Sequence, residues 1–207
     1  MRCHLTLDYI KNFQHLSDIE LIGDALQEED TWLRKSETYM WYYATAAASA
    51  PRIILELGVR YGYAGIAMVK GAKWSGKSVP VYIGIDSEFD GIKSNSVAEA
   101  NIRDITPMAC VWNVDTRYGK YIVDALRGTC NMVHVDGDHS VDGIERELDI
   151  AICCANSSGV ILVDDCNVPH IKSAVMNLCD RLHIRPFWLP TQNTTCVIDF
   201  LDGEPGV

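Results

Sequence analysis

Residues 53–63 read IILELGVRYGY, and this stretch decides how the rest of the chain is interpreted. An apolar run ends in Glu56, Gly58 follows, and Gly62 comes four residues later. The pattern predicts a buried strand, a tight turn in which Gly58 adopts a positive φ or approaches a ligand closely, and a helix over 64–74 that Gly62 allows to pack on the strand. Turns of this kind hold nucleotides in open α/β sheets. The stretch lacks the P-loop ending and the third glycine of the dinucleotide fingerprint, so alone it fits any strand-to-helix turn equally well.

The composition is that of a globular protein with an acidic surface. The chain has 207 residues, 48% apolar and 22% charged, which suits one domain with a single core. A net charge of −10 disfavours nucleic acid and anionic membranes as partners. No apolar run approaches the ~20 residues of a membrane helix. Residues 1–8 lack the apolar segment of a signal peptide, so we expect no cleaved leader.

The cysteines indicate the compartment. Eight are present, none with C-x-x-C spacing, and several lie inside apolar stretches such as 151–155. This usage is typical of buried thiols in a reducing environment rather than of a disulfide framework. We therefore expect a cytoplasmic protein.

The first fifty residues have helical patterns. Residues 17–20, SDIE, form a capping box, and a second helix is expected over about 36–48 because Pro51 prevents it from continuing. This second helix carries four aromatic residues, which we expect mostly to pack on a sheet, with the wall of a ligand pocket as the alternative: Tyr39, Trp41, Tyr42 and Tyr43.

From residue 52 onward, strands and helices alternate. Strands are expected at 52–57, 79–85, 109–113, 131–135 and 159–163, and helices at 64–74, 94–103, 116–127, 141–155 and 170–182. The last apolar runs, 184–189 and 195–201, leave no room for a helix between them and should pair antiparallel. The fold class is therefore α/β, a doubly wound mixed sheet with helices on both faces. We expect a single domain over 1–207, with 1–50 as an N-terminal helical extension or lid and 51–207 as the core.

Acidic residues follow five of the expected strands: Glu56, Asp86, Asp115, Asp136, and Asp164 with Asp165. In a parallel sheet these carboxyl ends share one edge, which is the ligand-binding edge. A row of uncompensated carboxylates is unfavourable, so a cationic or hydroxyl-bearing ligand is expected among them.

Asp86 lies where nucleotide-binding sheets place an acid that accepts hydrogen bonds from ribose hydroxyls. The alternative role is to cap the following helix, but Ser87 and Asp90 are also available for that. Asp86 is therefore a candidate cofactor-binding residue.

Asp136, Asp164 and Asp165 should converge because their strands are expected to be neighbours. Three carboxylates without thiolate suit Mg²⁺, Mn²⁺ or Ca²⁺. Asp138 and His139 follow at once, and either could take a proton from a hydroxyl held on the metal. Their alternative role is to cap the helix 141–155, which Ser140 could also do. His134 alternates to the opposite face from Val133 and Val135 and is expected to be a core histidine.

These motifs resemble a known family. Residues 56–62, ELGVRYG, resemble the first motif of class I S-adenosylmethionine-dependent methyltransferases. Residues 135–139, VDGDH, and 159–165, GVILVDD, are similar to the metal-dependent O-methyltransferases of the macrocin and novobiocin sugar type, and more distantly to catechol and caffeoyl-CoA O-methyltransferases. His139 and Asp165 stand where the catechol branch usually has lysine and asparagine, so the sugar type fits better. That type generally has a longer N-terminal lid, which leaves the acceptor open.

The resemblance implies a Rossmann-like, seven-stranded mixed sheet whose last strand is antiparallel. It also implies a role for each candidate: Glu56 and Gly58 beside the methionine part of the cofactor, Asp86 on the ribose, Asp115 beside the adenine, Gly62 and Asp136 also in the cofactor-binding set, Asp136, Asp164 and Asp165 on Mg²⁺, and Asp138 or His139 as the base.

We therefore expect an S-adenosylmethionine-dependent, metal-assisted O-methyltransferase that acts on a hydroxyl of a small molecule. Sugar, catechol and amino-acid-derived hydroxyls all remain open as acceptors, and a homo-oligomer is compatible with the sequence. One alternative is a nucleotide-linked oxidoreductase, against which the missing third glycine and the three carboxylates argue. The other is a protein that binds the cofactor without turnover.

Overall fold

The computed structural model describes residues 5–13, 36–76, 79–88, 91 and 93–202. The capping box expected at 17–20 lies outside these residues. None of the helices in the described ranges is both long and apolar enough to cross a membrane.

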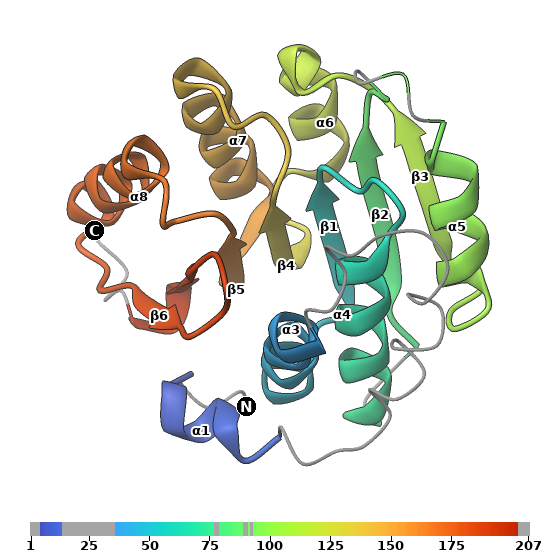
Figure 1. Cartoon of the computed structure of the whole chain (residues 1–207), viewed down its shortest axis with the longest axis horizontal. Helices are drawn as coiled ribbons and strands as arrows, with labels where there is room; N and C mark the ends of the chain where they lie inside the picture. The colour runs from blue at the N-terminus through green and yellow to red at the C-terminus, as the bar shows by residue number, and fades with distance from the viewer. Residues whose placement is uncertain (1–4, 14–35, 77–78, 89–90, 92, 203–207) are drawn as a thin grey trace.

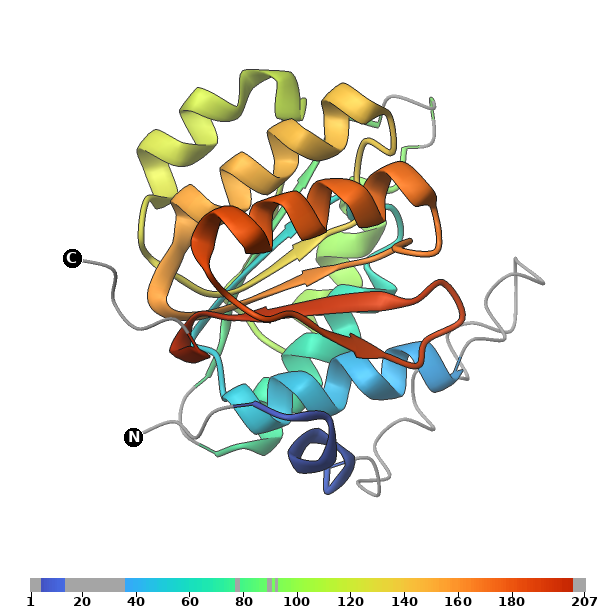
Figure 2. The same ribbon diagram turned by 90° about the vertical axis from the view of Figure 1, so that its left-hand side faces the viewer.

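Among the described residues, seven strands form one sheet in the order β3-β2-β1-β4-β5-β7-β6 (Figure 1). The strands are β1 Ile53–Leu57, β2 Val81–Asp86, β3 Ala109–Asn113, β4 Cys130–Val135, β5 Ala155–Val163, β6 Phe187–Leu189 and β7 Thr195–Asp199. Strands β1 to β5 pair in parallel, whereas β7 is antiparallel to both β5 and β6. The mixed sheet expected from the sequence is therefore confirmed, and β7 lies between β5 and β6 (Figure 2).

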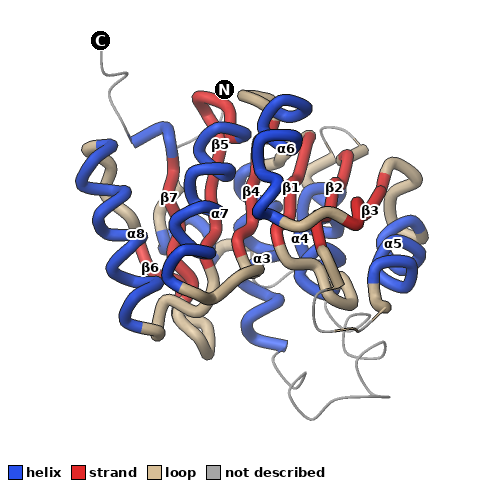
Figure 3. The backbone as a smooth tube through the Cα atoms, turned by 90° about the horizontal axis from the view of Figure 1, so that it is seen from above, coloured by secondary structure: helices blue, strands red, loops and turns tan. Residues whose placement is uncertain are grey.

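Helices cover both faces of the sheet (Figure 3). One face carries α3 Ser36–Ser49, α4 Tyr63–Trp74 and α5 Asn95–Arg103, and the other carries α6 Gly119–Leu126, α7 Val141–Cys154 and α8 Pro169–Leu182. The short helix α1 Leu7–Lys11 contributes Ile10 to the hydrophobic cluster that includes α3. Each face has its own hydrophobic cluster, which confirms the doubly wound arrangement.

Helix α3 occupies the position predicted for the second N-terminal helix and ends just before Pro51. Trp41, Tyr42 and Tyr43 are buried, as expected for residues that pack on the sheet. Tyr39 differs from them because it is only partly buried. The seven cysteines that the structure describes are all free thiols, and five of them are buried, in agreement with the expected buried thiols.

Several element boundaries differ from the sequence prediction, among them β5, which begins at Ala155 and not at 159, and two of the differences have clear local reasons. The expected helix 116–127 divides into a 3₁₀ turn, Thr116–Tyr118, and α6, because Asp115 caps the turn by accepting a hydrogen bond from the Arg117 backbone N–H at 2.7 Å. The strand expected at 184–189 begins only at Phe187, because the Ile184 N–H bonds to the Cys179 carbonyl at 3.0 Å and closes the end of α8.

The two glycines of the turn after β1 have different neighbours. Gly58 has φ +84, and a Cβ atom there would lie 2.1 Å from the Asp136 carbonyl oxygen. The turn after β1 thus packs directly on the turn after β4. Gly62 has φ +80 and precedes α4, and its Cβ would meet Ala98 and Ile102 of α5 at 3.0 Å. The expectation that Gly62 packs on the strand is wrong, because its open side faces α5.

The close approach at Gly58 can be tested against a matched glycine. Gly128 also has a positive φ, +64, but no atom lies within 4 Å of a Cβ placed there. We expect Gly128→Ala to lower the free energy of unfolding by about 1 kcal/mol, from backbone strain alone. Gly58→Ala should lower it by about 3 kcal/mol, because overpacking adds to that strain. Urea unfolding measures both, and equal losses would contradict the close contact.

Candidate active site

The carboxyl ends of the central strands are held in register beyond the last residue of each strand. The Gly58 N–H bonds to the Ile85 carbonyl, and the Asp136 N–H bonds to the Leu57 carbonyl, both at 2.9 Å. The Asp164 N–H bonds to the Val135 carbonyl at 3.0 Å. These backbone bonds place the glycine turn and the acids along one edge, as the sequence predicts.

Glu56 lies beneath this edge, inside the α3–α4 face. Its side chain is 1% exposed, and both oxygens accept hydrogen bonds, one from the Tyr82 hydroxyl and one from His134 Nδ1 at 3.1 Å. Burial disfavours a charged His134, but the hydrogen bond to Glu56 and the negative charges of Glu56, Asp136 and Asp164 together outweigh it and raise the pKa of His134 to about 9. The His134 ring also packs on Tyr42, with centroids 5.0 Å apart. The expectation of a core histidine is confirmed.

Asp86 holds the glycine turn in shape. Its Oδ2 accepts hydrogen bonds from the backbone N–H groups of Val59 at 2.9 Å and Arg60 at 2.8 Å, and its Oδ1 accepts one from Glu88 at 2.7 Å. Ser94 occupies the N-cap position of α5 without a side-chain capping bond, and the N–H of Asn95 donates to Glu88 Oε1 at 3.0 Å. The carboxylate of Asp86 therefore stabilises the turn before α4, whereas its backbone carbonyl accepts a hydrogen bond from the Asn95 side chain at the start of α5 at 3.0 Å.

Asp115 lies at the same edge after β3 and has a fixed partner. Its Oδ2 accepts two hydrogen bonds from the Arg117 guanidinium, from Nε at 2.9 Å and from Nη2 at 2.7 Å. These bonds lower the pKa of Asp115. The charge of this carboxylate is therefore balanced within its own turn.

A second group gathers at the ends of β4 and β5. One ligand atom each from Asp136, His139 and Asp165 lie within 4.8 Å of one another. His139 Nε2 lies 3.4 Å from Asp136 Oδ1 and 3.3 Å from Asp165 Oδ2. The hydrogen bond to Asp136 raises the pKa of His139 to about 9, and partial burial raises the pKa of Asp136 to about 6. A positive imidazole thus lies between two carboxylates.

Asp164 stands apart from this group. Its Oδ1 accepts a hydrogen bond from Thr195 Oγ1 at 2.9 Å, and Thr195 Oγ1 in turn contacts the Tyr42 hydroxyl at 3.2 Å and Thr191 Oγ1 at 2.9 Å. Asp165 has φ +54, so its backbone turns between the two acids. The structure therefore brings together Asp136 and Asp165 of the predicted metal-binding residues, with His139 beside them and Asp164 bound to β7.

Asp138 is turned toward α7. Its Oδ1 accepts a hydrogen bond from the Ser140 N–H at 3.0 Å, and its Oδ2 accepts one from Arg146 Nη2 at 2.8 Å. Both lower the pKa of Asp138. Ser140 caps α7, as its Oγ accepts a hydrogen bond from the Gly143 N–H at 3.1 Å. Of the two candidate bases, only His139 points into the acidic group.

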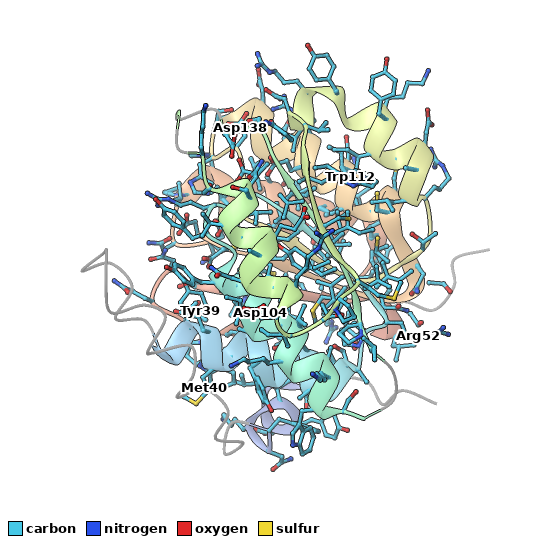
Figure 4. The ribbon with its side chains drawn as sticks, turned by 90° about the vertical axis from the view of Figure 1, so that its right-hand side faces the viewer. Tyr39, Met40, Arg52, Asp104, Trp112 and Asp138 are labelled. Carbon is cyan, nitrogen blue, oxygen red and sulfur yellow. The ribbon has the colours of Figure 1, made fainter. Side chains whose placement is uncertain are left out.

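Tyr39 is an aromatic neighbour of this edge. Its ring packs against Tyr42 and Tyr63, with centroids 6.2 and 6.4 Å apart. Burial and then the charges of Asp136 and Glu56 raise its pKa. Figure 4 shows Tyr39 and Asp138 toward the same side of the molecule, opposite Arg52 at the start of β1. The packing role expected from the sequence is confirmed for the three buried aromatics of α3, and the pocket-wall alternative stays a prediction for Tyr39.

Two residues that organise the site were not predicted. Glu147 of α7 is 1% exposed and bonds to the loop after β4. Its signal in the sequence is a charged residue within the apolar stripe of a helix, beside Ile144 and Leu148. Thr195 carries no such signal, because a threonine at the start of a strand is ordinary.

The strand order, the glycine turn and the acids at the carboxyl edge together define the Rossmann-like methyltransferase fold. A comparison with protein families agrees, since the family described as "Methyltransferase domain" matches residues 55–166, more than half of the chain. The chain belongs to this family. This match confirms the class I methyltransferase that the sequence predicts. A separate search of curated proteins finds no match.

Solved structures share the fold at low sequence identity. An O-methyltransferase from Bacillus cereus, in complex with SAH, is 13% identical with a TM-score of 0.63, over 94% of this chain and 92% of that one. SAH-bound PaMTH1 from Podospora anserina is 15% identical with a TM-score of 0.60, over 95% and 89%. TomG from Streptomyces achromogenes, an O-methyltransferase involved in tomaymycin synthesis and in complex with SAM, is 14% identical with a TM-score of 0.59, over 95% and 90%.

The link from β7 to Asp164 gives a prediction about stability. Thr195→Val removes the hydroxyl that donates to Asp164 and contacts Tyr42 and Thr191, so we expect a loss of about 2 kcal/mol in the free energy of unfolding. Tyr42→Phe removes a hydroxyl at the edge of this network, beside Thr195 and Asp164, and should lower the free energy of unfolding by about 1 kcal/mol. Urea unfolding compares the two variants. A larger loss for Tyr42→Phe would show that Thr195 is not the centre of this network.

Proposed function

We propose that this chain transfers a methyl group from S-adenosylmethionine to a hydroxyl of a small molecule, with a divalent cation such as Mg²⁺ at Asp136 and Asp165. The observation that carries the proposal is the group of Asp136, His139 and Asp165 beside the glycine turn of a methyltransferase domain. The structural neighbours described as O-methyltransferases in complex with SAH or SAM support it.

The glycine turn suits a cofactor of this kind. Gly58 and Gly62 both have positive φ, and Asp86 orders the backbone N–H groups of Val59 and Arg60 between them. Asp86 would hold the ribose and Asp115 would lie beside the adenine, with Gly58 and Gly62 along the cofactor. Glu56 would support the turn from beneath without touching the cofactor, because both of its oxygens already accept hydrogen bonds from Tyr82 and His134. When bound, S-adenosylmethionine supplies an electrophilic methyl group.

The acidic group suits a hard cation. Asp136 and Asp165 present carboxylate oxygens, which Mg²⁺ prefers, and both lie within 3.4 Å of the positive imidazole of His139. A divalent cation there would lower the pKa of an acceptor hydroxyl. Asp164, bound by Thr195, would add negative charge beside the ion from the β7 side.

His139 is the better candidate for the base. Its Nε2 lies within the group, and its side chain is 49% exposed, so it can meet an acceptor. To accept a proton at Nε2, His139 first has to release the one that Asp136 stabilises. Asp138 is engaged by Arg146 and Ser140, and its lowered pKa makes it a weaker base. We propose that Asp138 orders the loop while His139 accepts the proton.

Metal binding can be measured without knowing the acceptor. Titration with MgCl₂ in a calorimeter should show binding to the unmodified chain and a loss of at least tenfold in affinity for Asp136→Asn or Asp165→Asn, because each removes a charged ligand. Asp138→Asn is the matched control, since its carboxylate already has other partners, and should stay within about threefold of wild type. Equal losses in all three variants would contradict the assignment.

Methyl transfer tests the reaction itself. We expect transfer from labelled S-adenosylmethionine to at least one member of a panel of sugar, catechol and amino-acid-derived hydroxyls, with loss of activity in EDTA and recovery on added Mg²⁺. His139→Asn should lower kcat by about 10²- to 10⁴-fold without weakening SAH binding, the range expected for loss of a general base. Asp138→Asn should lower it less than tenfold. A chain that binds SAH yet methylates nothing would favour a cofactor-binding protein without turnover.

A further inference from the structure

Glu147 is a buried acid that the proposed reaction does not use. It lies on the buried side of α7, in line with Ile144, Leu148 and Ala151, where an apolar residue would normally pack. Its neighbour Arg146 pairs with Asp138. Arg146 is therefore engaged elsewhere, and neither core packing nor an ion pair with Arg146 explains why a carboxylate occupies this position.

One oxygen of Glu147 binds two separate loops. Oε1 accepts a hydrogen bond from the Asp138 N–H at 3.0 Å and another from Thr116 Oγ1 at 3.0 Å. Asp138 lies in the loop 136–140 after β4, whereas Thr116 begins the turn after β3. In the sheet, β3 and β4 are separated by β2 and β1. Glu147 thus connects two loops that no direct strand pairing connects.

The packing around the carboxylate is tight. A Cβ atom on Gly137 would lie 2.4 Å from Glu147 Oε1, so a side chain at 137 would displace the carboxylate end of Glu147. The glycine between Asp136 and Asp138 therefore has a structural reason. The loop contacts Glu147 at Gly137 and Asp138, next to the point where the side chains of Asp136 and Asp138 point in different directions.

The arrangement is not explained by stability alone. Glu147 Oε2 is buried and has no hydrogen-bond partner among the described residues, and burial raises the pKa of Glu147. The free energy lost in burying a carboxylate is comparable with what a few hydrogen bonds return. A buried polar group of this kind is better explained by the geometry that it imposes on its partners.

We propose that Glu147 is a positioning residue that couples the turn 114–118 to the loop 136–140, so that cofactor binding beside Asp115 orders Asp136 and His139. The role of the cofactor rests on the proposed function, whereas the link between the loops does not. Two sites joined in this way bind their ligands cooperatively, each raising the affinity for the other by the same factor.

The test uses the full chain and two variants that remove the hydrogen bonds of Glu147 to the turn 114–118 or to both loops. Thr116→Val keeps the branched shape and removes only the hydroxyl that bonds to Glu147, so it preserves the bond between Glu147 and Asp138. Glu147→Met removes both bonds. Glu145→Gln, at an exposed acid on the same helix, is the control.

Hydrogen exchange with and without saturating SAH is the first measurement. In wild type and Glu145→Gln, SAH should slow amide exchange in both 114–118 and 136–140. In Thr116→Val, SAH should still protect 114–118, but the protection of 136–140 should fall at least fivefold. Protection of 136–140 that persists in Thr116→Val, or that is absent in wild type bound to SAH, overturns the proposal.

Magnesium affinity is the second measurement and separates positioning from simple structural support. Wild type should bind Mg²⁺ at least fivefold more tightly with SAH than without it, and this ratio should approach one in Thr116→Val and Glu147→Met. A merely structural role would weaken both affinities and leave the ratio unchanged, which would overturn the coupling.

If the wild-type chain bound no SAH, the proposed function would be contradicted, but the structural coupling of the two loops through Glu147 would not. Exchange in the ligand-free chain then decides: Thr116→Val should speed exchange in 136–140, although its own substitution lies in the other loop. Unchanged exchange there would show that the two loops are independent.

Discussion

Negative charge collects at the carboxyl edge of the sheet, and the structure around that edge depends on balancing it. Each acid has a hydrogen-bonding partner, and two acids share one: His134 for Glu56, backbone N–H groups for Asp86, Arg117 for Asp115, Arg146 for Asp138, Thr195 for Asp164, and His139 for both Asp136 and Asp165. Because these partners come from β4, β7, α7 and the turns at the edge, balancing the charge also connects these elements to one another.

The hydrogen-bonding partners of these acids differ in how readily a cation or a substrate could take their place. Guanidinium groups do not lose their charge, backbone N–H groups are fixed, and His134 is buried. His139 is the exception, because it is half-exposed, titratable and shared by two carboxylates. This difference is why we propose the cation and the proton transfer at Asp136 and Asp165, and why the neighbouring acids serve to shape the turns around them.

Much of the fold could be predicted because it depends on local patterns. Strand and helix alternation, the glycine turn and the antiparallel hairpin each leave a signal within about ten residues. The predicted element boundaries were wrong where a capping hydrogen bond changed the local structure. Asp115 caps a 3₁₀ turn before α6, and the Ile184 N–H bonds to the end of α8, so that the strand begins later. The resemblance to class I methyltransferases also rests on local motifs, and the match of the methyltransferase domain family over residues 55–166 bears it out.

The site was predicted less completely for a physical reason. The sequence placed the acids at strand ends, since that follows from where each apolar run stops. Which acids meet depends on strand order and on backbone direction at single residues. Insertion of β7 beside β5 brings Thr195 to Asp164, and the left-handed backbone at Asp165 accompanies the separation of that acid from its neighbour. Glu147 joins two loops because α7, which follows β4, also packs against the turn after β3, a contact that no stretch of sequence contains.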